Sequence, residues 1–556
     1  MYSTKTNVQQ LISCFKEYCI ANIVVCPGSR NAPIVQSFAA DDTFFCHSVV
    51  DERSAGFYAI GLYHATGETV AVCCTSGSAL LNLAPAVAEA YYQKIPMIII
   101  SADRPQRWIG QMDGQTLPQQ GVFNGLVKKD VQLVETEDEE SRWYNNRLIN
   151  EAVLATIRHS MGPVHINVPI TEPMFDFSAD ELPIERVITH NTTLPLMTDE
   201  KELWMNYHKV LVICGQESPV TPAFNIDQLS DKGCVIFTEL LANYGSEDRF
   251  ITNFDSVLSI YNNDKECPEE LIPDLVITIG GHIVSKRLKG FLRAHHVDHW
   301  LINEDGNITD TFMSVTKVIE GEQTACIKNL STLPKKKNDF YDAWKKISDT
   351  VKKRSDEYFE TITTDLSSMN MVQHAMKRVN NMVSLHLGNS MAVRLAQLCQ
   401  PAIFTPTLCN RGVNGIEGTL SSAIGYSKET GEIGLVIIGD LSFFYDMNVL
   451  RHAHDMANLR ILLLNNGGGA IFHTLKGLNE ASALNEYVAA GHYTNAEGWA
   501  KELGFSYLKV IDVSQIDTAM DMLFSDDASH PVLIEAITDS TFDKHIFNNY
   551  YKYIQQ

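Results

Sequence analysis

The sequence predicts an α/β protein built from three doubly wound parallel sheets. Short apolar runs alternate with helical patterns along most of the 556 residues, which is typical of parallel sheets covered by helices. A polar stretch near Thr189–Glu202 and a charged stretch at Lys335–Asp339 interrupt this alternation. On length alone we expect about three or four domains. The interruptions favour three, spanning residues 1–185, 186–345 and 346–556.

The apolar runs have the length of buried strands, and the segments between them have the length of helices. In the first domain the expected strands are Asn22–Cys26, Phe44–Val50, Val70–Cys74, Met97–Ser101 and Pro163–Val168. In the second domain they are Val210–Cys214, Val235–Thr238, Leu275–Ile279 and Trp300–Ile302. A long amphipathic helix is expected to follow Lys335–Asp339.

Composition and charge restrict the possible partners. Hydrophobic residues make up 45% of the chain and charged residues 20%, as in ordinary globular proteins. No apolar segment approaches the ~20 residues needed to span a bilayer, and the polar N-terminus lacks the apolar centre of a signal peptide. A net charge of −23 disfavours nucleic acids and anionic membranes. The 12 cysteines form no CxxC pair, so we expect reduced thiols in a cytoplasmic protein.

The third domain contains the most informative stretch. One apolar run, Gly434–Ile438, ends in Gly-Asp, and the next, Ile461–Leu464, ends in Asn-Asn-Gly-Gly-Gly. Two such runs separated by a helix predict a βαβ unit whose strands end at the same edge, so Asp440 and Asn466 should face one another. A carboxylate, an amide oxygen and exposed glycine backbone suit Mg²⁺ and a diphosphate. Taken alone, the stretch could equally be a Rossmann-like turn with an ordinary Asp.

This stretch resembles the cofactor motif of thiamine diphosphate (ThDP)-dependent enzymes, in which Gly-Asp is followed about 25 residues later by Asn-Asn. The resemblance implies that Asp440, Asn466 and Gly468 ligate Mg²⁺, with Mn²⁺ as an alternative ion. It covers nearly the whole chain and is weakest between about Arg186 and Leu271. It also implies that the cofactor contacts Leu441, Ser442, Gly469, Ala470 and Ile471.

Two residues depart from the usual form of this motif, and the first indicates a particular branch of the family. Leu441 stands where the family usually has Gly, and GDLSFFYDMN is similar to the motif of a menaquinone-pathway branch. Ala470 stands where relatives can have Gln. Neither departure changes the expected class of reaction.

Glu52 lies where a strand leads into the helical sequence DERSAGFYAIGLYHATG. Alone, a Glu at this junction could simply interact with the helix dipole. The resemblance gives it a catalytic role: its carboxyl group contacts N1′ of the cofactor's aminopyrimidine and relays the proton that activates C2. Such a carboxyl group should be poorly solvated, which raises its pKa.

A second loop of the third domain is rich in glycine, within NRGVNGIEGTLSSAIGY (Asn410–Tyr426). Its small residues permit tight turns and close helix packing. Ile416 could be one more core residue. The resemblance instead places Ile416 beneath the cofactor, which it bends into a V shape.

Several loops combine arginine or lysine with glycine and serine. Such cations usually pair with local acids at the surface. However, arginine also forms bidentate hydrogen bonds to carboxylates, and two carboxylate-rich substrates would need several such groups. The resemblance implies that Ser390 and Arg394 hold 2-oxoglutarate. It assigns the isochorismate site to Ser29, Arg30, Arg104, Gln115, Lys286, Arg287 and Arg411. Gly114 replaces an Asn that the family often has before this Gln, and Asp113 is a possible substitute contact.

The expected activity is therefore that of a transferase using ThDP and Mg²⁺. The resemblance implies decarboxylation of 2-oxoglutarate and 1,4-addition of the succinyl-semialdehyde carbanion to isochorismate. It also implies a homodimer, or a homotetramer built from two dimers, with sites shared between subunits. Alternatives are an acetolactate synthase-type carboligase, a flavin-containing oxidase and a non-catalytic scaffold. No Ser-His-Asp or zinc arrangement is evident, and His295, His296, Asp298 and His299 are expected in a surface loop.

Overall fold

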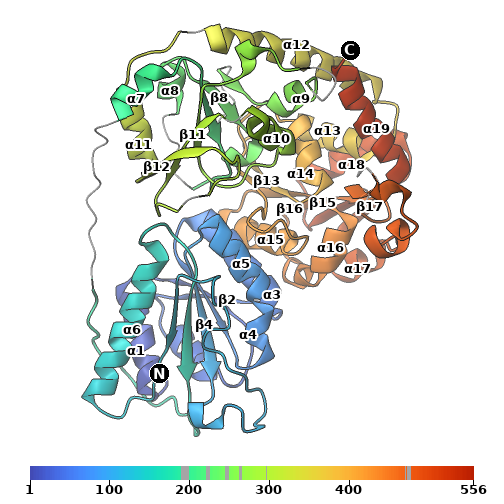
Figure 1. Cartoon of the computed structure of the whole chain (residues 1–556). Helices are drawn as coiled ribbons and strands as arrows, with labels where there is room; N and C mark the ends of the chain where they lie inside the picture. Colours follow the sequence, from blue (N-terminus) through green and yellow to red (C-terminus); the bar gives the residue numbers. More distant parts are fainter. Residues whose placement is uncertain are drawn as a thin grey trace. The chain divides into compact units, whose positions relative to one another are not determined.

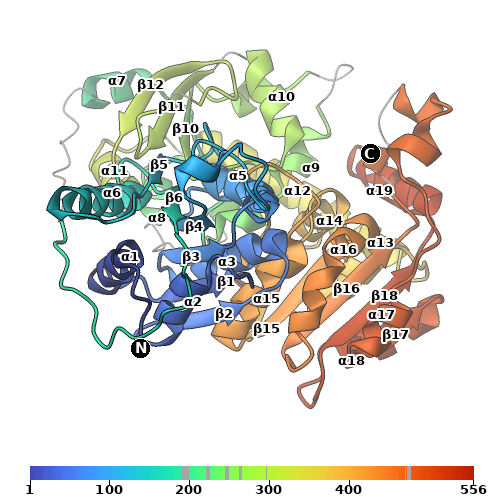
Figure 2. The same ribbon diagram turned by 90° about the horizontal axis from the view of Figure 1, so that it is seen from below.

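Three six-stranded sheets form the framework of the protein (Figures 1 and 2). The computed structural model describes residues 1–188, 200–220, 226–244, 249–261, 266–295, 297–307, 309–337, 339–469, 471–472 and 477–556. Every strand pairing in these sheets is parallel, which confirms the α/β class. No helix among the described residues is long and apolar enough to span a membrane.

The first sheet has the strand order β2-β1-β3-β4-β6-β5. Each expected strand is present, with bounds shifted by a few residues or less. β5 was not predicted, because its sequence KDVQ is polar and only Val131 is buried. The strands are β1 (Asn22–Val25), β2 (Phe45–Ser48), β3 (Val70–Cys74), β4 (Met97–Asp103), β5 (Lys129–Gln132) and β6 (Val164–Pro169). The helices are α1 (Thr6–Glu17), α2 (Ala32–Ala39), α3 (Glu52–Thr66), α4 (Ser78–Asn82), α5 (Ala84–Gln93) and α6 (Glu139–Ile157).

The second sheet has the order β12-β11-β10-β7-β8-β9, the doubly wound order of Rossmann-type folds. Its two edge strands were not predicted, because β9 has two residues and β12 is mostly half-buried. The strands are β7 (Val210–Cys214), β8 (Val235–Thr238), β9 (Phe250–Ile251), β10 (Leu275–Ile279), β11 (Asp298–Asn303) and β12 (Val315–Glu320). The helices are α7 (Glu200–Asn206), α8 (Asp227–Ser230), α9 (Phe254–Leu258), α10 (Lys286–His295), α11 (Gln323–Leu330) and α12 (Asp339–Thr361).

Two expectations for the second domain need correction. The linker predicted at Thr189–Glu202 ends earlier, because α7 begins at Glu200; residues 189–199 lie outside the described chain. The histidine-rich segment is not a surface loop. His295 ends α10 and His299 lies in β11, where its buried ring bonds Thr278 at 2.7 Å. His296 lies outside the described residues.

The third sheet, β14-β13-β15-β16-β18-β17, repeats the connectivity of the first sheet. The strands are β13 (Val383–Leu387), β14 (Thr407–Leu408), β15 (Ile433–Gly439), β16 (Leu459–Asn465), β17 (Ser506–Val510) and β18 (Val532–Ile537). The helices are α13 (Ser368–Arg378), α14 (Met391–Leu398), α15 (Thr419–Thr430), α16 (Asp440–Asp446), α17 (Glu497–Glu502), α18 (Ile516–Leu523) and α19 (Ser540–Ile554).

The described chain divides into two compact units. Unit 1 comprises Met1–Thr192 together with Asn410–Gly431 and Tyr445–Ala453, so α15 belongs to it. Unit 2 comprises Thr193–Cys409, Glu432–Phe444 and His454–Gln556. Apolar residues from the second and third sheets share one buried cluster within unit 2.

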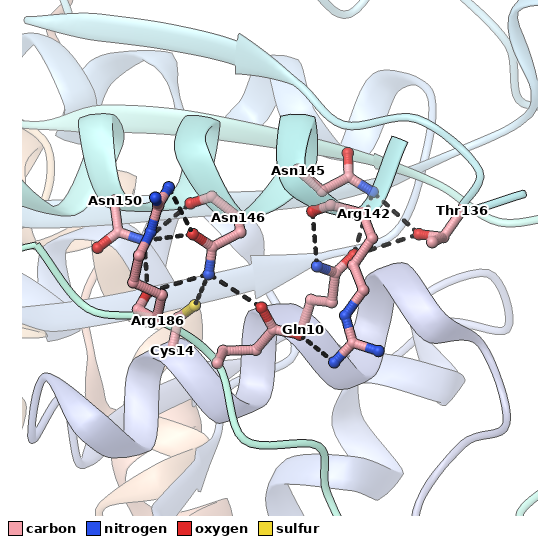
Figure 3. A network of polar contacts seen from close by, with 9 residues as sticks. Gln10, Cys14, Thr136, Arg142, Asn145, Asn146, Asn150 and Arg186 are labelled. Atoms are coloured by element: carbon pink, nitrogen blue, oxygen red, sulfur yellow. Dashed lines mark hydrogen bonds and ion pairs between the residues drawn. The ribbon is translucent and has the colours of Figure 1, made fainter. Parts of the chain in front are cut away.

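A buried polar network crosses the interior of unit 1 (Figure 3). Gln10 on α1 donates to the carbonyl of Arg142 on α6 at 2.9 Å. Further along α6, Asn146 and Asn150 each donate to the carbonyl of Arg186 at 3.0 Å. These buried amides have partners, as buried polar groups require. They fasten the segment at Arg186, near the predicted domain boundary, onto the first domain.

Helices α3 and α15 pack closely in unit 1 because small residues face backbone at their contact. A Cβ atom built on Gly61 would lie 1.9 Å from the carbonyl oxygen of Ser422, and one on Gly425 would lie 2.3 Å from that of Tyr58. The Ser422 hydroxyl donates to the carbonyl of Phe57 at 3.2 Å. Close packing by the small residues of the 410–426 segment was expected and is confirmed.

Replacing Gly61 with alanine should therefore destabilise unit 1 by about 1–3 kcal/mol, the usual cost of overpacking. The methyl group would meet backbone, which cannot move aside as a flexible side chain can. Differential scanning calorimetry would measure the lowered transition temperature. Gly290→Ala on α10 is the matched control, because nothing lies within 4 Å of its Cβ position. Equal transition temperatures for the two variants would contradict the packing argument.

Candidate active site

Asp440 and Asn466 lie at the ends of neighbouring strands, as the sequence predicted. β15 and β16 pair in parallel, with Gly439 opposite Leu464. Asp440 is buried, and its Oδ1 accepts the N–H of Leu441 at 2.6 Å. Its Oδ2 accepts the N–H groups of Gly467 and Gly468 at 2.8 and 2.9 Å. The carboxylate thus fixes the glycine loop against its own strand end.

Glycine is required in this loop for steric reasons. Gly467 and Gly468 have φ values of +81° and +144°, which side chains rarely tolerate. A Cβ on Gly468 would also lie 2.7 Å from the carbonyl oxygen of Ala489. The backbone is therefore available for close approach to a ligand.

The donor set at this edge suits a hard divalent cation. Burial raises the pKa of Asp440, although backbone N–H groups and His492 act in the opposite direction. A bound cation would favour the charged carboxylate in this poorly solvated position. The amide of Asn466 donates to Asp543 through Nδ2 at 3.0 Å, and no described residue donates to its Oδ1. A carboxylate, an amide oxygen and the Gly468 carbonyl are the oxygen ligands that Mg²⁺ accepts.

His492 is a residue of this edge that sequence reasoning missed. Its backbone N–H bonds the carbonyl of Gly467 at 3.0 Å, and its Nε2 lies 3.4 Å from Oδ2 of Asp440. Nδ1 accepts the N–H of Thr494 at 3.1 Å, so the neutral ring carries its proton on Nε2. His492 lies 26 residues beyond Asn466 and belongs to no recognisable motif.

The first Asn of the pair has a structural role. Asn465 donates to buried Glu535 on β18 at 2.7 Å, and its Oδ1 accepts the N–H of Gly467 at 3.3 Å. Glu535 also accepts the hydroxyl of Tyr507 at 2.6 Å and the N–H of Ala496 at 3.0 Å. The buried carboxylate of Glu535 therefore holds Asn465, which in turn bonds the glycine loop at Gly467.

Glu52 is the first residue of α3, but it does not cap the helix. The neighbouring Asp51 is the N-cap and accepts the N–H of Ser54 at 3.2 Å. Burial raises the pKa of Glu52, as predicted for a poorly solvated carboxyl group. Burial raises the pKa of the Cys26 thiol, just after β1, and of the Cys74 thiol, at the end of β3, and the charge of Glu52 adds to both effects. Its carboxyl group therefore lies near the strand-end edge of the first sheet.

The loop that carries Arg411 and Ile416 is held by a buried carboxylate of the first domain. Glu89 on α5 accepts the N–H groups of Gly412 and Val413 at 2.8 and 2.9 Å. Gln93 donates to the same carboxylate at 2.5 Å. Ile416 is 41% exposed within the described chain, which argues against an ordinary core role. Nothing in the sequence links Glu89 to a loop more than 300 positions away.

Two predicted substrate residues lie close together in unit 1. Arg30 is buried, donates to the carbonyl of Ile170 at 2.9 Å and pairs with Glu172 at 3.1 Å. Its pKa is lowered, first by burial and then by the charge of Arg104. Arg104 pairs with Asp113 at 2.9 Å and donates to the carbonyl of Gly114 at 3.0 Å. Local acids therefore orient both guanidinium groups.

Two further predicted substrate residues, Gln115 and Ser29, also lie in unit 1. The backbone of Gln115 has a φ of +55° and lies 3.2 Å from the Cβ position of Gly77. Ser29, which precedes Arg30, is exposed.

The cations of unit 2 have more varied surroundings. Lys286 and Arg287 are both exposed. Arg287 pairs with Asp255 at 2.7 Å and lies 3.9 Å over the ring of Tyr551. Arg394 on α14 donates through Nη1 to the carbonyl of Ser390, which has a φ of +71°. The predicted juxtaposition of Ser390 and Arg394 is thus present.

A Ser-His-Asp chain lies in the first domain, although none was expected. The Ser101 hydroxyl lies 2.7 Å from Nε2 of His165, whose Nδ1 lies 2.8 Å from Oδ2 of Asp130. Ser101 and His165 are fully buried, which denies a substrate access. Ser101 also donates to Asn167, which bonds Gln119 at 2.7 Å. The network therefore supports the base of the loop that carries Arg104 and Gln115.

The predicted site residues divide between the two units. Unit 1 holds Ser29, Arg30, Glu52, Arg104, Gln115, Arg411 and Ile416. Unit 2 holds Lys286, Arg287, Ser390, Arg394, Asp440, Leu441, Ser442, Asn466, Gly468, Gly469 and Ile471. Ala470 lies outside the described residues.

Comparison with known proteins identifies the class and then the family. Residues 5–131 match the family described as "Thiamine pyrophosphate enzyme, N-terminal TPP binding domain". Together with the Asp440–Asn466 strand edge, this match defines a thiamine diphosphate-dependent enzyme.

Relatives named 2-succinyl-5-enolpyruvyl-6-hydroxy-3-cyclohexene-1-carboxylate synthase match nearly the full chain. The Phocaeicola vulgatus protein is 45% identical over 99% of each chain, and the Bacteroides thetaiotaomicron protein is 44% identical over 100% of each. The Flavobacterium johnsoniae protein is 35% identical over 98% of each. The chain belongs to this synthase family.

Replacing Glu89 with alanine should loosen the loop that carries Ile416. The N–H groups of Gly412 and Val413 would lose their acceptor, and each such loss costs about 1–3 kcal/mol when the group stays buried. Hydrogen exchange followed by mass spectrometry should show faster exchange in peptides covering residues 410–418. Glu89→Gln keeps one side-chain oxygen and should give an intermediate rate. Unchanged exchange in both variants would show that another group fixes the loop.

Proposed function

We propose that the protein joins a decarboxylated 2-oxoglutarate unit to isochorismate, giving 2-succinyl-5-enolpyruvyl-6-hydroxy-3-cyclohexene-1-carboxylate in menaquinone biosynthesis. The observation that carries the proposal is the strand edge of Asp440 and Asn466 in a chain of this synthase family. ThDP supplies the electron sink for decarboxylation when it is bound. The chain's own residues bind, orient and move protons around it.

Asp440, Asn466 and the Gly468 carbonyl hold Mg²⁺, with Mn²⁺ as an alternative ion. The burial of Asp440, which raises its pKa, supports this role, because a bound cation would favour the charged carboxylate there. The absence of side chains at Gly467 and Gly468 would let the diphosphate approach the backbone of this loop closely. Further cofactor contacts would come from Leu441, Ser442, Gly469, Ala470 and Ile471, and Ile416 would support the cofactor.

Glu52 acts as the proton relay to N1′ of the aminopyrimidine. Support comes from its position beside Asp51, which caps α3, so that capping the helix does not require the Glu52 carboxyl group. The raised pKa of Glu52 lets the group keep its proton at higher pH than an exposed glutamate would.

The cationic residues bind the two substrates by their carboxylates. Ser390 and Arg394 receive the distal carboxylate of 2-oxoglutarate, and their hydrogen bond at the start of α14 supports this pairing. Arginine suits this task because its planar fork forms two parallel hydrogen bonds. Isochorismate is bound by Ser29, Arg30, Arg104, Gln115, Lys286, Arg287 and Arg411.

The active unit is a homodimer, or a dimer of dimers, in which each site takes Glu52 from one subunit and Asp440 from the other. The division of these two residues between the compact units is compatible with such sharing. All twelve cysteines are free thiols, which fits the reducing cytoplasm.

The direct test supplies 2-oxoglutarate, isochorismate, ThDP and Mg²⁺ and follows the loss of isochorismate absorbance. Turnover should require all four components. Turnover of pyruvate in place of 2-oxoglutarate would instead indicate an acetolactate synthase-type carboligase. A yellow chromophore in the purified protein would indicate a flavin enzyme.

Glu52→Gln should lower turnover by about 10²-fold or more, because an amide cannot relay the N1′ proton. Folding and ThDP binding should remain close to those of the unaltered protein, since Asp51 still caps α3. Steady-state kinetics and fluorescence titration with ThDP would measure the two effects. Near-normal turnover would remove Glu52 from the mechanism.

The same variant tests whether sites are shared. Glu52→Gln and Asp440→Ala chains should each be inactive alone. A mixed dimer would place both changes in one site and leave the other unaltered, so activity should recover to about half per mixed dimer. Inactive mixed dimers of folded chains would mean that each site is built within one chain.

Arg394→Ala should impair the use of 2-oxoglutarate more than that of isochorismate. Removing one partner of a desolvated charge pair costs ~2–5 kcal/mol, so kcat/KM for the keto acid should fall at least ~30-fold. Steady-state kinetics with each substrate varied in turn would measure both effects. A larger effect on isochorismate would reverse the assignment of the two pockets.

A further inference from the structure

Asp543 on α19 forms the contact that orients the amide of Asn466. Its Oδ2 accepts Nδ2 of Asn466 at 3.0 Å. The same oxygen accepts the hydroxyls of Ser368 at 2.6 Å and Thr538 at 2.8 Å. Its Oδ1 accepts the backbone N–H of Ser368 at 2.7 Å. One buried carboxylate therefore joins the start of α13, the end of β18 and the Asn-Asn-Gly loop.

The chemistry of these groups decides which end of the Asn466 amide faces the strand edge. An ionised carboxylate only accepts hydrogen bonds, so the NH₂ group of Asn466 must face Asp543. Its Oδ1 then points away from Asp543 and accepts nothing from any described residue. The reverse orientation would place two acceptors in contact and present NH₂ to a cation.

The geometry points to Asp543 as a positioning residue for divalent metal binding: it holds Asn466 so that an oxygen, not an NH₂ group, is presented beside Asp440. The inference rests on the proposed function, in which Asn466 ligates the ion. Residues that hydrogen-bond to metal ligands orient those ligands and thereby affect the affinity for the metal. A purely structural role, that of anchoring the start of α13 through the Ser368 N–H, is the competing explanation.

The Asp543→Asn variant separates the two explanations because it preserves shape. The Ser368 N–H can only donate, so the oxygen of the new amide should remain on it. The new NH₂ group would then face Asn466, whose own amide should turn and present NH₂ to the cation. Anchoring of α13 survives this change, whereas metal ligation does not.

The experiment titrates the full chain, supplied with ThDP, with Mn²⁺ and measures free Mn²⁺ by electron paramagnetic resonance. Asp543→Asn should weaken the Mn²⁺ affinity by about 10- to 100-fold. Asp539→Asn is the matched control at the N-cap of the same helix, because asparagine can still accept the N–H of Phe542 that Asp539 accepts. The control should leave the Mn²⁺ affinity unchanged.

The double variant Asn466→Asp/Asp543→Asn exchanges the acceptor and the donor. The new amide at position 543 can then donate to the new carboxylate at position 466, which presents oxygen to the ion. Most of the lost Mn²⁺ affinity should return. A role confined to anchoring α13 predicts no loss of Mn²⁺ affinity in Asp543→Asn and therefore nothing to recover. A loss in Asp543→Asn that the double variant does not restore would overturn the inference.

A second pair of variants tests the contact between Asp543 and Asn466 without altering either residue. Thr538→Val removes one hydrogen bond that fixes Oδ2 of Asp543, and Thr538→Ser keeps the hydroxyl. The first should weaken the Mn²⁺ affinity and the second should preserve it. Unchanged affinity in both Thr538→Val and Asp543→Asn would overturn the role of Asp543. Failure of the unaltered chain with ThDP to bind Mn²⁺ would instead overturn the proposed function itself.

Discussion

Asp440 lies where two buried parallel strands end, and its carboxylate holds the chain on both sides of that edge. The hydrogen bonds from Leu441, Gly467 and Gly468 form only because β15 and β16 are neighbours in register. Apolar strands place the edge, and the carboxylate then converts it into a fixed arrangement of oxygen atoms and N–H groups. The chemistry of the candidate site depends on this arrangement.

Buried carboxylates fix loops at several other places in the protein. Glu535 supports Asn465, Glu89 holds the loop before α15, and Glu239 accepts the N–H groups of Val284 and Ser285 at the start of α10. A charged acceptor makes stronger hydrogen bonds to backbone than a neutral one does. Part of the acidic character of the chain therefore lies inside the fold, where it orders backbone rather than repelling anions.

An arginine in the cationic loops can both pair with a local acid and contribute to an anion-binding region. Arg30, Arg104 and Arg287 each pair with an acid, as surface arginines usually do. Arg30 is nevertheless buried and close enough to Arg104 for the second charge to lower its pKa. Acid partners that hold neighbouring cations in place leave a region that an anionic ligand can neutralise. Structural pairing and substrate binding are thus compatible.

The sequence by itself determined the α/β class, most of the central strands and the Asp440–Asn466 edge. These features follow from local signals, namely apolar runs and the glycines that end them. It did not reveal β5 or β12, whose residues are only partly buried at sheet edges. Only the tertiary structure brought Glu89 to Gly412, His492 to Asp440 and Asp543 to Asn466. These contacts join residues far apart in the chain, and no local pattern encodes them. Their polar groups meet because the helices and sheets that carry them pack together.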